Sequence, residues 1–417
     1  MTTLTLTADQ QAGYDAIYSF VLDPSQSVFV LRGFSGTGKS TLVSHFLDQL
    51  PSLMKAVRLI NPNQKTEYEV KLTATTNKAA EALAHATGET VSTIHSALSL
   101  RVRTDYKTGK TALRVAPGAE PLENTILVVD EASYIDTPLL HLIFSQTRRC
   151  KLLLMGDPDQ LLNMNCDQSP VFNAGYPEVR LSQVVRQDAG NPIIDLSAQF
   201  RHLVQTGNWF SFVPDGHHIQ HLSREDFETE IIREFTRSDR HHSNSRVLAW
   251  TNKTAIAYNK AIAQLASGSK ELQAGDYAIC NSYISSRQGS IKTDQMVHIT
   301  KVSQRETSWY DTPGHRYELD GRVQFFMPES QATRKIALKR AQAEDNWSAM
   351  QEIQDGWLDL REAYASTINK SQGSTYDRVY IDLDDLKKCR NTNTLARLLY
   401  VGVSRARHQV FLTGDLV

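Results

Sequence analysis

Short apolar runs recur through the first half of the chain, separated by longer stretches with helical spacing. Each run is rich in leucine or β-branched residues and is followed by polar or turn-forming residues. Strands buried on both faces have this pattern, because parallel sheets are covered by helices on both sides. The pattern therefore predicts buried parallel strands at residues 28–31, 70–74, 125–129 and 151–155.

The second half of the chain repeats the pattern. Apolar runs at 246–250, 378–381 and 409–412 predict further core strands. Strands that alternate with helices indicate an α/β fold with parallel sheets. With 417 residues the chain is long enough for roughly two to four domains. We therefore expect two α/β lobes, one near residues 1–185 and the other near 186–417.

Two stretches break this rhythm. Around 97–116, apolar and polar residues alternate on both sides of a glycine-containing turn, which predicts a β-hairpin. Residues 276–330 are rich in strand-forming segments, and a helical pattern of large apolar residues follows. We interpret 276–362 as a β-rich insertion in the second lobe. The apolar stripe is interpreted as a helix face packed on a core and consists of Trp347, Met350, Ile353, Trp357 and Leu360.

Composition narrows the class of protein without identifying it. The hydrophobic fraction of 41% and the charged fraction of 22% are ordinary for a soluble globular protein. The formal net charge of −1 argues against a protein that coats nucleic acid through bulk positive charge, but not against a local DNA groove. No run approaches the ~20 apolar residues of a membrane span, and no signal peptide is evident. The four scattered cysteines suit a reducing compartment, so we expect a cytoplasmic protein without a membrane partner.

The most specific motif lies directly after the first predicted strand. Residues 33–40 satisfy the pattern G-x-x-x-x-G-K-[ST], and a predicted helix follows them in the chain. The glycines let the backbone curl so that its N–H groups point at phosphate oxygens, Lys39 can reach the β- and γ-phosphates, and the Ser40 hydroxyl can ligate Mg²⁺. The predicted nucleotide-binding residues of this loop are Ser35, Gly36, Thr37, Gly38, Lys39, Ser40 and Thr41.

Polar residues follow two further predicted strands. Asp130 and Glu131 come directly after the strand at 125–129. Asp130 can hold Mg²⁺, and Glu131 can orient and deprotonate the attacking water. An acidic pair after a strand is common, but its place downstream of a P-loop favours the catalytic interpretation. Gln160, in the polar turn after 151–155, is a candidate sensor of the γ-phosphate.

Phosphoryl transfer also needs positive charge beyond the P-loop lysine. The candidates are Arg186 and Arg405. The chain has 45 lysines and arginines, so a single arginine is more often a surface charge, and only its place within a pattern supports a catalytic role.

Taken in order, these segments resemble the superfamily 1 helicases, and in particular the RecD-like and Dda-like 5′-to-3′ branch, superfamily 1B. The resemblance covers about residues 6–415 and is strongest at the motifs. It implies two RecA-like P-loop lobes and ATP with Mg²⁺ as cofactors. It also assigns adenine recognition to Gln10, γ-phosphate contacts to Arg186 and Arg405, and a nucleotide contact to Gly373.

The resemblance further implies a set of DNA contacts. Asn369 stands where the family usually has histidine, which makes a contact there less certain than at the other positions. Considered singly, the threonines can equally cap helices or end strands, and Trp250 can be a core residue; their order around a complete ATPase favours DNA contact. The residues are Thr75, Thr76, Lys78, Thr93, His95, Trp250, Thr251, Asn252, Thr367, Asn369 and Lys370.

The family pattern also predicts the domain organisation. The first lobe spans 1–185 and carries the hairpin, at about 96–120, as a wedge. The second lobe spans 186–275 and 363–417, with the 276–362 insertion expected to be SH3-like. The expected activity is ATP-driven movement along single-stranded DNA, 5′ to 3′, with unwinding at a duplex junction. The expected protein is a monomer, with replication or single-strand-binding proteins as partners.

Two other functions fit the same motifs. The first is a superfamily 1 RNA helicase, which ATPase stimulation by RNA rather than DNA would reveal. The second is a nucleotide-gated interaction module without unwinding activity, which predicts slow turnover that single strands do not change.

Overall fold

A computed structural model describes residues 6–60, 68–104, 111–163, 166, 168–185, 190–237, 239, 241–269, 271–286 and 289–416. The chain forms two compact units. Unit 1 consists of Met1–Phe210 together with Leu399–Ser404, and unit 2 consists of Ser211–Leu398 together with Arg405–Val417. Unit 1 thus extends beyond the predicted boundary at residue 185 and includes the chain up to Phe210.

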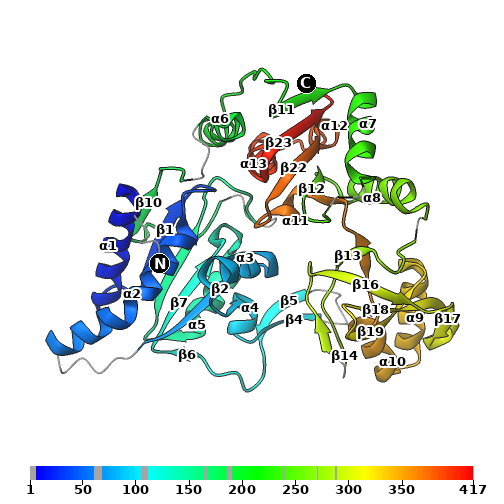
Figure 1. The fold of residues 1–417 in the computed structure, drawn as a ribbon. Coiled ribbons are helices and arrows are strands. Elements are labelled where there is room, and N and C mark those ends of the chain that lie inside the picture. The colour runs from blue at the N-terminus through cyan, green and yellow to red at the C-terminus, as the bar shows by residue number, and fades with distance from the viewer. Residues whose placement is uncertain are drawn as a thin grey trace. The chain divides into compact units, whose positions relative to one another are not determined.

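Unit 1 is built on a sheet of six parallel strands (Figure 1). Four of the strands are those predicted from the apolar runs. The order across the sheet is β10 (Glu178–Leu181), β1 (Val28–Gly33), β9 (Lys151–Gly156), β7 (Thr125–Asp130), β2 (Glu69–Ala74) and β3 (Val91–Thr93).

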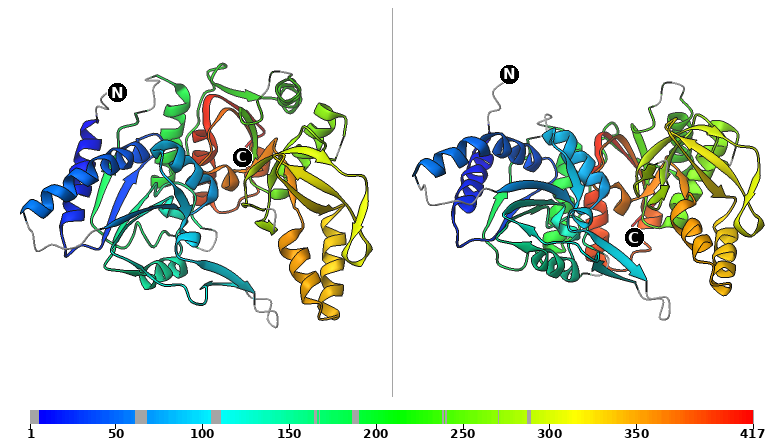
Figure 2. Two further views of the ribbon diagram at one scale, coloured as in Figure 1. Left: turned by 60° about the horizontal axis from the view of Figure 1, so that its bottom comes forward. Right: turned by 90° about the horizontal axis from the view of Figure 1, so that it is seen from below.

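Alternate residues of β1 serve two hydrophobic clusters, one on each face of this sheet. Phe29 and Leu31 pack in a cluster with the apolar faces of α1 (Ala8–Leu22) and α2 (Lys39–Ile60). Val28 and Val30 belong to a second cluster that includes α5 (Thr137–Ser145) on the opposite face (Figures 1 and 2). Because both faces are covered, the strands are mostly apolar, which explains why short apolar runs mark them in the sequence.

Short elements complete unit 1. The predicted hairpin is present: β4 (Leu100–Thr104) pairs antiparallel with β5 (Thr111–Val115). The remaining elements are α3 (Asn77–Thr87), α4 (Ile94–Ala97), β6 (Leu122–Glu123), η1 (Ala132–Tyr134), β8 (Thr147–Arg148) and α6 (Pro192–Thr206).

Unit 2 contains a second parallel sheet, which includes the three strands predicted in this half. Its order is β11 (Ile219–Leu222), β23 (Ala406–Thr413), β22 (Tyr376–Asp382), β12 (Ser245–Ala249) and β21 (Ala365–Thr367). Its helices are α7 (Arg224–Phe235), α8 (Asn252–Ser267), α11 (Ile368–Ser371), α12 (Leu383–Leu386) and α13 (Thr392–Ser404), of which the last turn belongs to unit 1.

The insertion is an antiparallel β-structure, as its strand-rich sequence indicated (Figure 1). It holds its own apolar cluster, separate from that of the parallel sheet. Its strands are β13 (Tyr277–Cys280), β14 (Ile284–Ser286), β15 (Gly289–Ile291), β16 (Met296–Val302), β17 (Glu306–Ser308), β18 (Thr312–Leu319), β19 (Val323–Pro328) and β20 (Leu360–Glu362), with η2 (Trp309–Asp311) between β17 and β18.

The helix predicted from Trp347 to Leu360 is only partly correct. After α9 (Gln331–Ala343), α10 (Trp347–Gln351) continues into the single π-turn η3 (Glu352–Gly356) and ends there. Trp357 is fully buried in extended backbone, and Leu360 lies in β20, paired with Cys280. Apolar residues continue past the end of the helix because the extended segment that follows is also buried. A buried strand is apolar as well, so apolar residues alone do not mark where the helix ends.

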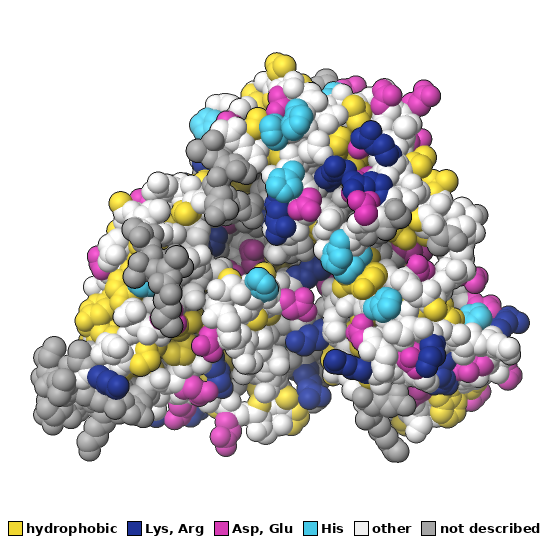
Figure 3. All heavy atoms as spheres, viewed as in Figure 1, with side chains coloured by type: hydrophobic (Ala, Val, Ile, Leu, Met, Phe, Trp, Pro, Cys, Tyr) yellow, Lys and Arg dark blue, Asp and Glu magenta, His cyan; other side chains and the backbone are white. Residues whose placement is uncertain are grey.

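On the face shown in Figure 3, lysine and arginine side chains are interspersed with aspartate and glutamate. This mixture of signs fits the formal net charge of −1. Among the described helices, none is long and apolar enough to cross a membrane.

Candidate nucleotide-binding and DNA-contact sites

The predicted ATPase motifs follow neighbouring strands of the first sheet. The P-loop follows β1, the turn with Gln160 follows β9, and Asp130 ends β7; these strands are adjacent. Because they are parallel, their carboxyl ends meet at one edge of the sheet, where open α/β sheets bind ligands. The structure thus brings together at this edge three of the segments that the sequence assigned to nucleotide chemistry.

The P-loop has the curled backbone that its glycines predict. Gly36 and Gly38 have φ values of 85° and 79°, in the left-handed region that favours glycine. The Thr37 hydroxyl donates to the Phe34 carbonyl at 2.9 Å, which closes the turn. The Lys39 ammonium donates to the carbonyls of Gly33, at 2.7 Å, and Phe34, at 3.2 Å. The lysine is therefore folded back along the loop.

Gln10 supports the P-loop from α1. Its amide oxygen accepts from the Thr7 N–H at 3.0 Å, and its own backbone N–H donates to the Thr7 hydroxyl oxygen at 3.2 Å. Its amide nitrogen donates to the Thr37 carbonyl at 3.3 Å. A Cβ on Gly38 would lie 2.3 Å from this nitrogen, so any larger residue there would displace the Gln10 amide from the loop. Adenine recognition by Gln10 stays a prediction, but the structural link to the phosphate loop was not foreseen.

Asp130 and Glu131 form a half-buried acidic pair, in which the backbone of Glu131 is strained. Burial and the neighbouring Glu131 carboxylate raise the pKa of Asp130 to about 7, against the opposing effect of the Lys39 ammonium. Glu131 has φ 54° and ψ 45°, a left-handed conformation that costs a non-glycine residue about 1–2 kcal/mol. A carboxylate that is buried and within electrostatic range of Lys39 suits a divalent cation, which would favour its charged form. Asp130 and Ser40 are the residues that would hold Mg²⁺.

The turn after β9 is organised by a buried carboxylate. Asp157 is fully buried, and its Oδ1 accepts from the Asp159 N–H at 3.0 Å. Its Oδ2 accepts from the Gln160 side-chain amide at 3.2 Å. Gln160 is 3% exposed, so its amide orientation is set by protein contacts rather than by water. The predicted γ-phosphate sensor therefore depends on Asp157, which sequence reasoning had treated only as part of a turn.

Of the three other residues assigned to the nucleotide, the structure describes Arg405 and Gly373. Arg186 lies outside the described residues. Arg405 directly precedes β23 and is 5% exposed; its carbonyl accepts from the Tyr376 N–H at 2.8 Å and its guanidinium donates to the Ser374 carbonyl at 3.2 Å. Gly373 has φ 78° just after α11. The finger and nucleotide roles of these residues stay predictions.

Most of the threonines predicted to contact DNA are helix N-caps, the alternative that their sequence context left open. Thr76, Thr93, Thr251 and Thr367 each accept the backbone N–H three residues ahead with the side-chain oxygen. Thr75 differs, because its hydroxyl donates to the Glu131 carbonyl at 3.1 Å. Capping uses the oxygen as an acceptor and leaves the hydroxyl proton to donate elsewhere. In Thr251 that proton is donated to the Asp385 carboxylate at 3.0 Å.

The caps share one position in both sheets. In unit 1 they follow β2 and β3, the two strands at one edge of the sheet. In unit 2 they follow β12 and β21, again the two strands at one edge. The carboxyl ends of these strand pairs thus hold the DNA-assigned residues, beside rather than among the strands that carry the nucleotide motifs in unit 1.

The other DNA-assigned residues are held by neighbouring protein groups. Lys370 donates to the Asn281 side chain at 2.7 Å and forms an ion pair with Asp294 at 3.1 Å, both in the insertion. Burial lowers the pKa of His95, although Asp136 opposes this, so the imidazole is neutral at neutral pH. Trp250 is partly buried, as the core alternative allowed. Lys78, Asn252 and Asn369 lie in the first turns of α3, α8 and α11.

Asp385 is a functional candidate that sequence reasoning missed. It is 1% exposed, and its Oδ2 accepts the N–H groups of Trp250 and Thr251, each at 2.8 Å. It also accepts the hydroxyl of Thr254 at 2.7 Å and the ammonium of Lys388 at 2.8 Å. This one carboxylate therefore fixes the turn that the resemblance assigns to DNA. The acidic run at 382–385 was its only signal in the sequence.

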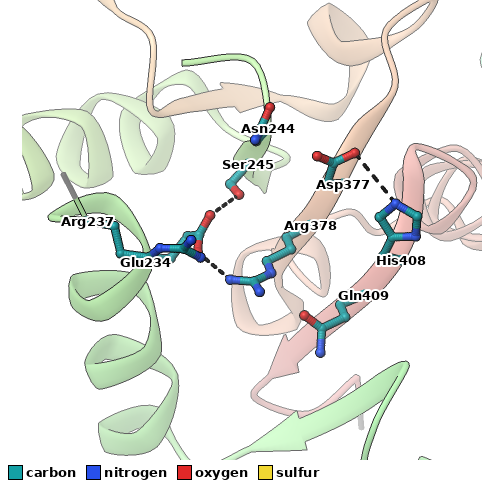
Figure 4. A pocket seen from close by; sticks show the side chains of 8 residues that line it. All are labelled: Glu234, Arg237, Asn244, Ser245, Asp377, Arg378, His408 and Gln409. Atoms are coloured by element: carbon teal, nitrogen blue, oxygen red, sulfur yellow. Dashed lines mark hydrogen bonds and ion pairs between the residues drawn. The ribbon is translucent and has the colours of Figure 1, made fainter. Parts of the chain in front are cut away.

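A polar cavity of about 210 Å³ lies elsewhere in unit 2 (Figure 4). It opens at the amino-terminal ends of β12, β22 and β23. Its buried Glu234 is already satisfied by the Ser245 hydroxyl and the guanidinium groups of Arg237 and Arg378. The cavity thus consists of internally paired charges, away from the strand ends that carry the DNA-assigned residues.

With the fold and site described, comparison with known proteins identifies the class. A family model described as an AAA domain matches residues 5–224, and one described as a UvrD-like helicase C-terminal domain matches residues 362–413. The chain belongs to the AAA-domain family. The second model and the relatives below support the resemblance of its motifs to the superfamily 1B helicases.

Particular relatives support this assignment. The ATP-dependent DNA helicase dda of Enterobacteria phage T4 is 24% identical over a 460-residue alignment that covers 99% of this chain and 100% of the relative. The ATP-dependent RecD2 DNA helicase of Deinococcus radiodurans is 34% identical over 175 residues, which cover 42% of this chain but only 21% of RecD2. The Bacteroides Pif1 helicase in complex with ADP-AlF3 and ssDNA shares the fold, with a TM-score of 0.54, 14% identity, and coverage of 99% of this chain and 93% of that one.

Replacing Asp385 should destabilise unit 2. In Asp385→Asn, the amide nitrogen cannot accept the N–H groups that the carboxylate accepts, so we expect a loss of about 1–3 kcal/mol in the free energy of unfolding, measured in urea at pH 7. Burial raises the pKa of Asp385, but hydrogen bonds from Lys388, Thr251 and Thr254 outweigh it and the net shift is downward. A carboxyl with a lowered pKa stabilises above its ordinary value of 3.8, and this contribution is lost as pH falls through the folded-state pKa.

Asp384→Asn is the matched control for this variant. Asp384 lies next to Asp385 and pairs with Arg224 and Lys387, but its side chain is 43% exposed. Exposed ion pairs contribute about 0–1 kcal/mol, so this variant should lose much less stability. Equal losses in both variants would contradict the role of Asp385 as the support of the 250–252 turn.

Proposed function

We propose that the chain is an ATP-driven DNA helicase that moves along single-stranded DNA in the 5′-to-3′ direction and unwinds duplex DNA. The observation that supports it best is the order of motifs along one sheet edge. In unit 1 the strands with the nucleotide motifs, β1, β9 and β7, stand next to the strands with the DNA-assigned residues, β2 and β3. One sheet therefore carries both the nucleotide motifs and part of the proposed DNA-binding surface.

The ATPase chemistry assigns a separate task to each residue at this edge. Backbone N–H groups of residues 35–41 and the Lys39 ammonium bind the phosphates. Ser40 and Asp130 would hold Mg²⁺, which would supply positive charge to the phosphates. Glu131 orients the water and accepts its proton, while Gln160 contacts the γ-phosphate.

Coupling to movement requires positive charge that arrives only in one state of the cycle. We assign this role to Arg186 and Arg405, which complete the site when the units close on ATP and leave it after phosphate release. Gln10 and Gly373 contact the rest of the nucleotide. Closure and opening then alternate the grip on DNA and produce net stepping.

The DNA is held mainly through its backbone. Capping hydroxyls at the strand ends of both units can donate to phosphate oxygens, which gives a grip that does not depend on sequence. Thr75 supports a direct link to catalysis, because its N–H and hydroxyl bond the carbonyls of Asp130 and Glu131 at 3.2 and 3.1 Å. A movement of the turn after β2 when DNA binds is therefore transmitted to Asp130 and Glu131.

The appended structures supply the remaining functions. The β4–β5 hairpin acts as the wedge at the duplex junction, and the insertion steers or clamps the strand. We place this activity in DNA replication, recombination or repair in the cytoplasm, with single-strand-binding proteins as partners of a monomer. The alignment with the phage T4 relative supports the DNA helicase activity itself.

Strand displacement on tailed duplexes tests the proposal directly. We expect unwinding of a duplex with a 5′ single-stranded tail, dependent on ATP, and little unwinding with a 3′ tail. Unwinding only from the 3′ tail would refute the polarity, and no unwinding from either would refute the helicase activity. ATPase assays with matched DNA and RNA oligonucleotides separate a DNA motor from an RNA helicase, and turnover unchanged by both would indicate a nucleotide-gated module.

Glu131→Gln and Lys39→Ala should each abolish DNA-stimulated ATP hydrolysis while leaving the fold intact. The first removes the proton acceptor and the second the phosphate-binding charge, and general-base loss alone typically costs on the order of 10²–10⁴ in rate. Steady-state ATPase assays with saturating single strands measure the effect, with circular dichroism as the control for folding. Wild-type turnover in either variant would contradict the site assignment.

Arg405→Ala should retain ATP binding and lose hydrolysis, because the arginine is assigned to the transition state rather than to the bound nucleotide. We expect a fall in kcat on the order of 10³ or more. Arg407→Ala is the control, since Arg407 lies on the same segment but its side chain is 59% exposed and pairs with Asp377. Normal kcat in Arg405→Ala would remove the finger role.

A further inference from the structure

A buried tyrosine touches two of the nucleotide motifs in unit 1. Tyr400 is 1% exposed and lies in the last turns of α13, which unit 1 includes. Its hydroxyl donates to the Asp157 Oδ2 at 2.6 Å. The same phenol oxygen accepts the backbone N–H of Ser35 in the P-loop. One hydroxyl thus uses both its donor and its acceptor capacity to join the phosphate loop to the turn after β9.

The oxygen that Tyr400 contacts is the one that holds Gln160. Asp157 Oδ2 accepts from Tyr400 at 2.6 Å and from the Gln160 side-chain amide at 3.2 Å. Because Asp157 is fully buried, no water can replace a lost donor without rearrangement. The position of the carboxylate, and with it the direction of the Gln160 amide, therefore depends on the tyrosine hydroxyl.

The surroundings keep this hydroxyl in its role as a neutral donor. Burial and the Asp157 carboxylate both raise the pKa of Tyr400 well above its usual range, so the phenol stays protonated. Arg201 on α6 interacts with it electrostatically, and the same guanidinium lies 3.6 Å from the centroid of the Phe34 ring in the P-loop. The tyrosine is thus packed among groups that line the phosphate loop.

We infer that Tyr400 is a positioning residue for ATP hydrolysis, which orients Gln160 through Asp157 and ties this orientation to helix α13. The inference rests on the proposed function, because it gives Gln160 its task at the γ-phosphate. Arg405 follows directly after α13 in the chain. A displacement of α13 that carries Arg405 therefore also pulls on the hydroxyl that sets Gln160, so the sensor and the arginine change state together.

The variant Tyr400→Phe tests this role, because it removes only the hydroxyl and keeps the buried ring. We expect kcat for DNA-stimulated ATP hydrolysis to fall at least 10-fold, while KM for ATP and the affinity for a fluorescent ATP analogue change less than 3-fold, about 0.65 kcal/mol by RT ln K. Tyr258→Phe is the matched control. The Tyr258 hydroxyl also donates to a carboxylate, Asp382 at 2.8 Å, but lies in unit 2 among groups with no assigned role at the nucleotide.

A double-mutant cycle with Gln160→Ala separates positioning from stability. If Tyr400 acts through Gln160, adding Tyr400→Phe to Gln160→Ala should lower kcat by less than 2-fold. Independent, multiplicative losses would overturn the inference, as would equal losses of kcat in Tyr400→Phe and Tyr258→Phe at matched thermal stability.

Assays of the wild-type protein distinguish failure of the positioning role from failure of the helicase proposal. A wild type that hydrolyses ATP on DNA, with Tyr400→Phe unchanged, would overturn the positioning role and leave the helicase proposal standing. A wild type without DNA-stimulated hydrolysis would overturn the helicase proposal and the positioning role with it.

Discussion

Burial of the parallel strands on both faces is the constraint on which the rest of the structure depends. Helices cover each side of the first sheet, so most residues within its strands are apolar. Polar groups that act on a ligand are therefore favoured where a strand ends. Since the strands are parallel, their carboxyl ends meet at one edge, and the P-loop, Asp130 and the turn with Gln160 are found there. The motifs lie far apart in the sequence but share this edge for that reason.

Buried carboxylates then fix the turns that leave this edge. Asp157 holds the turn with Gln160, and Asp385 holds the turn at 250–252 in the second sheet. A buried charge is costly unless several donors satisfy it, so each carboxylate fixes the geometry of the groups around it. The same requirement makes Asp130 unusual, because its burial and its proximity to Glu131 are only partly offset by Lys39, and its pKa is raised to about 7. Of these three carboxylates, Asp130 is therefore the one best suited to bind a divalent cation.

Much of the fold and of the nucleotide site could be predicted from the sequence, because both depend on local patterns. Apolar runs located the core strands, and the spacing from Gly33 to Ser40 located the P-loop with its left-handed glycines. The hairpin could also be predicted, since alternation around a turn is a local signal. The end of the helix after Trp347 could not, because a buried strand and a buried helix face look alike once apolar residues are dense.

The sequence by itself determined which residues have nucleotide chemistry and in which order they occur, because the P-loop and the acidic pair act through backbone conformation and side-chain type within a few residues. Only the tertiary structure decided how those residues are held. Gln10 reaches the P-loop, Thr75 bonds the acidic pair, and Tyr400 meets Asp157 across a wide separation in the chain. Such hydrogen bonds leave no regular spacing of residues in the sequence. They depend on which strand ends and helix ends the sheet order brings together.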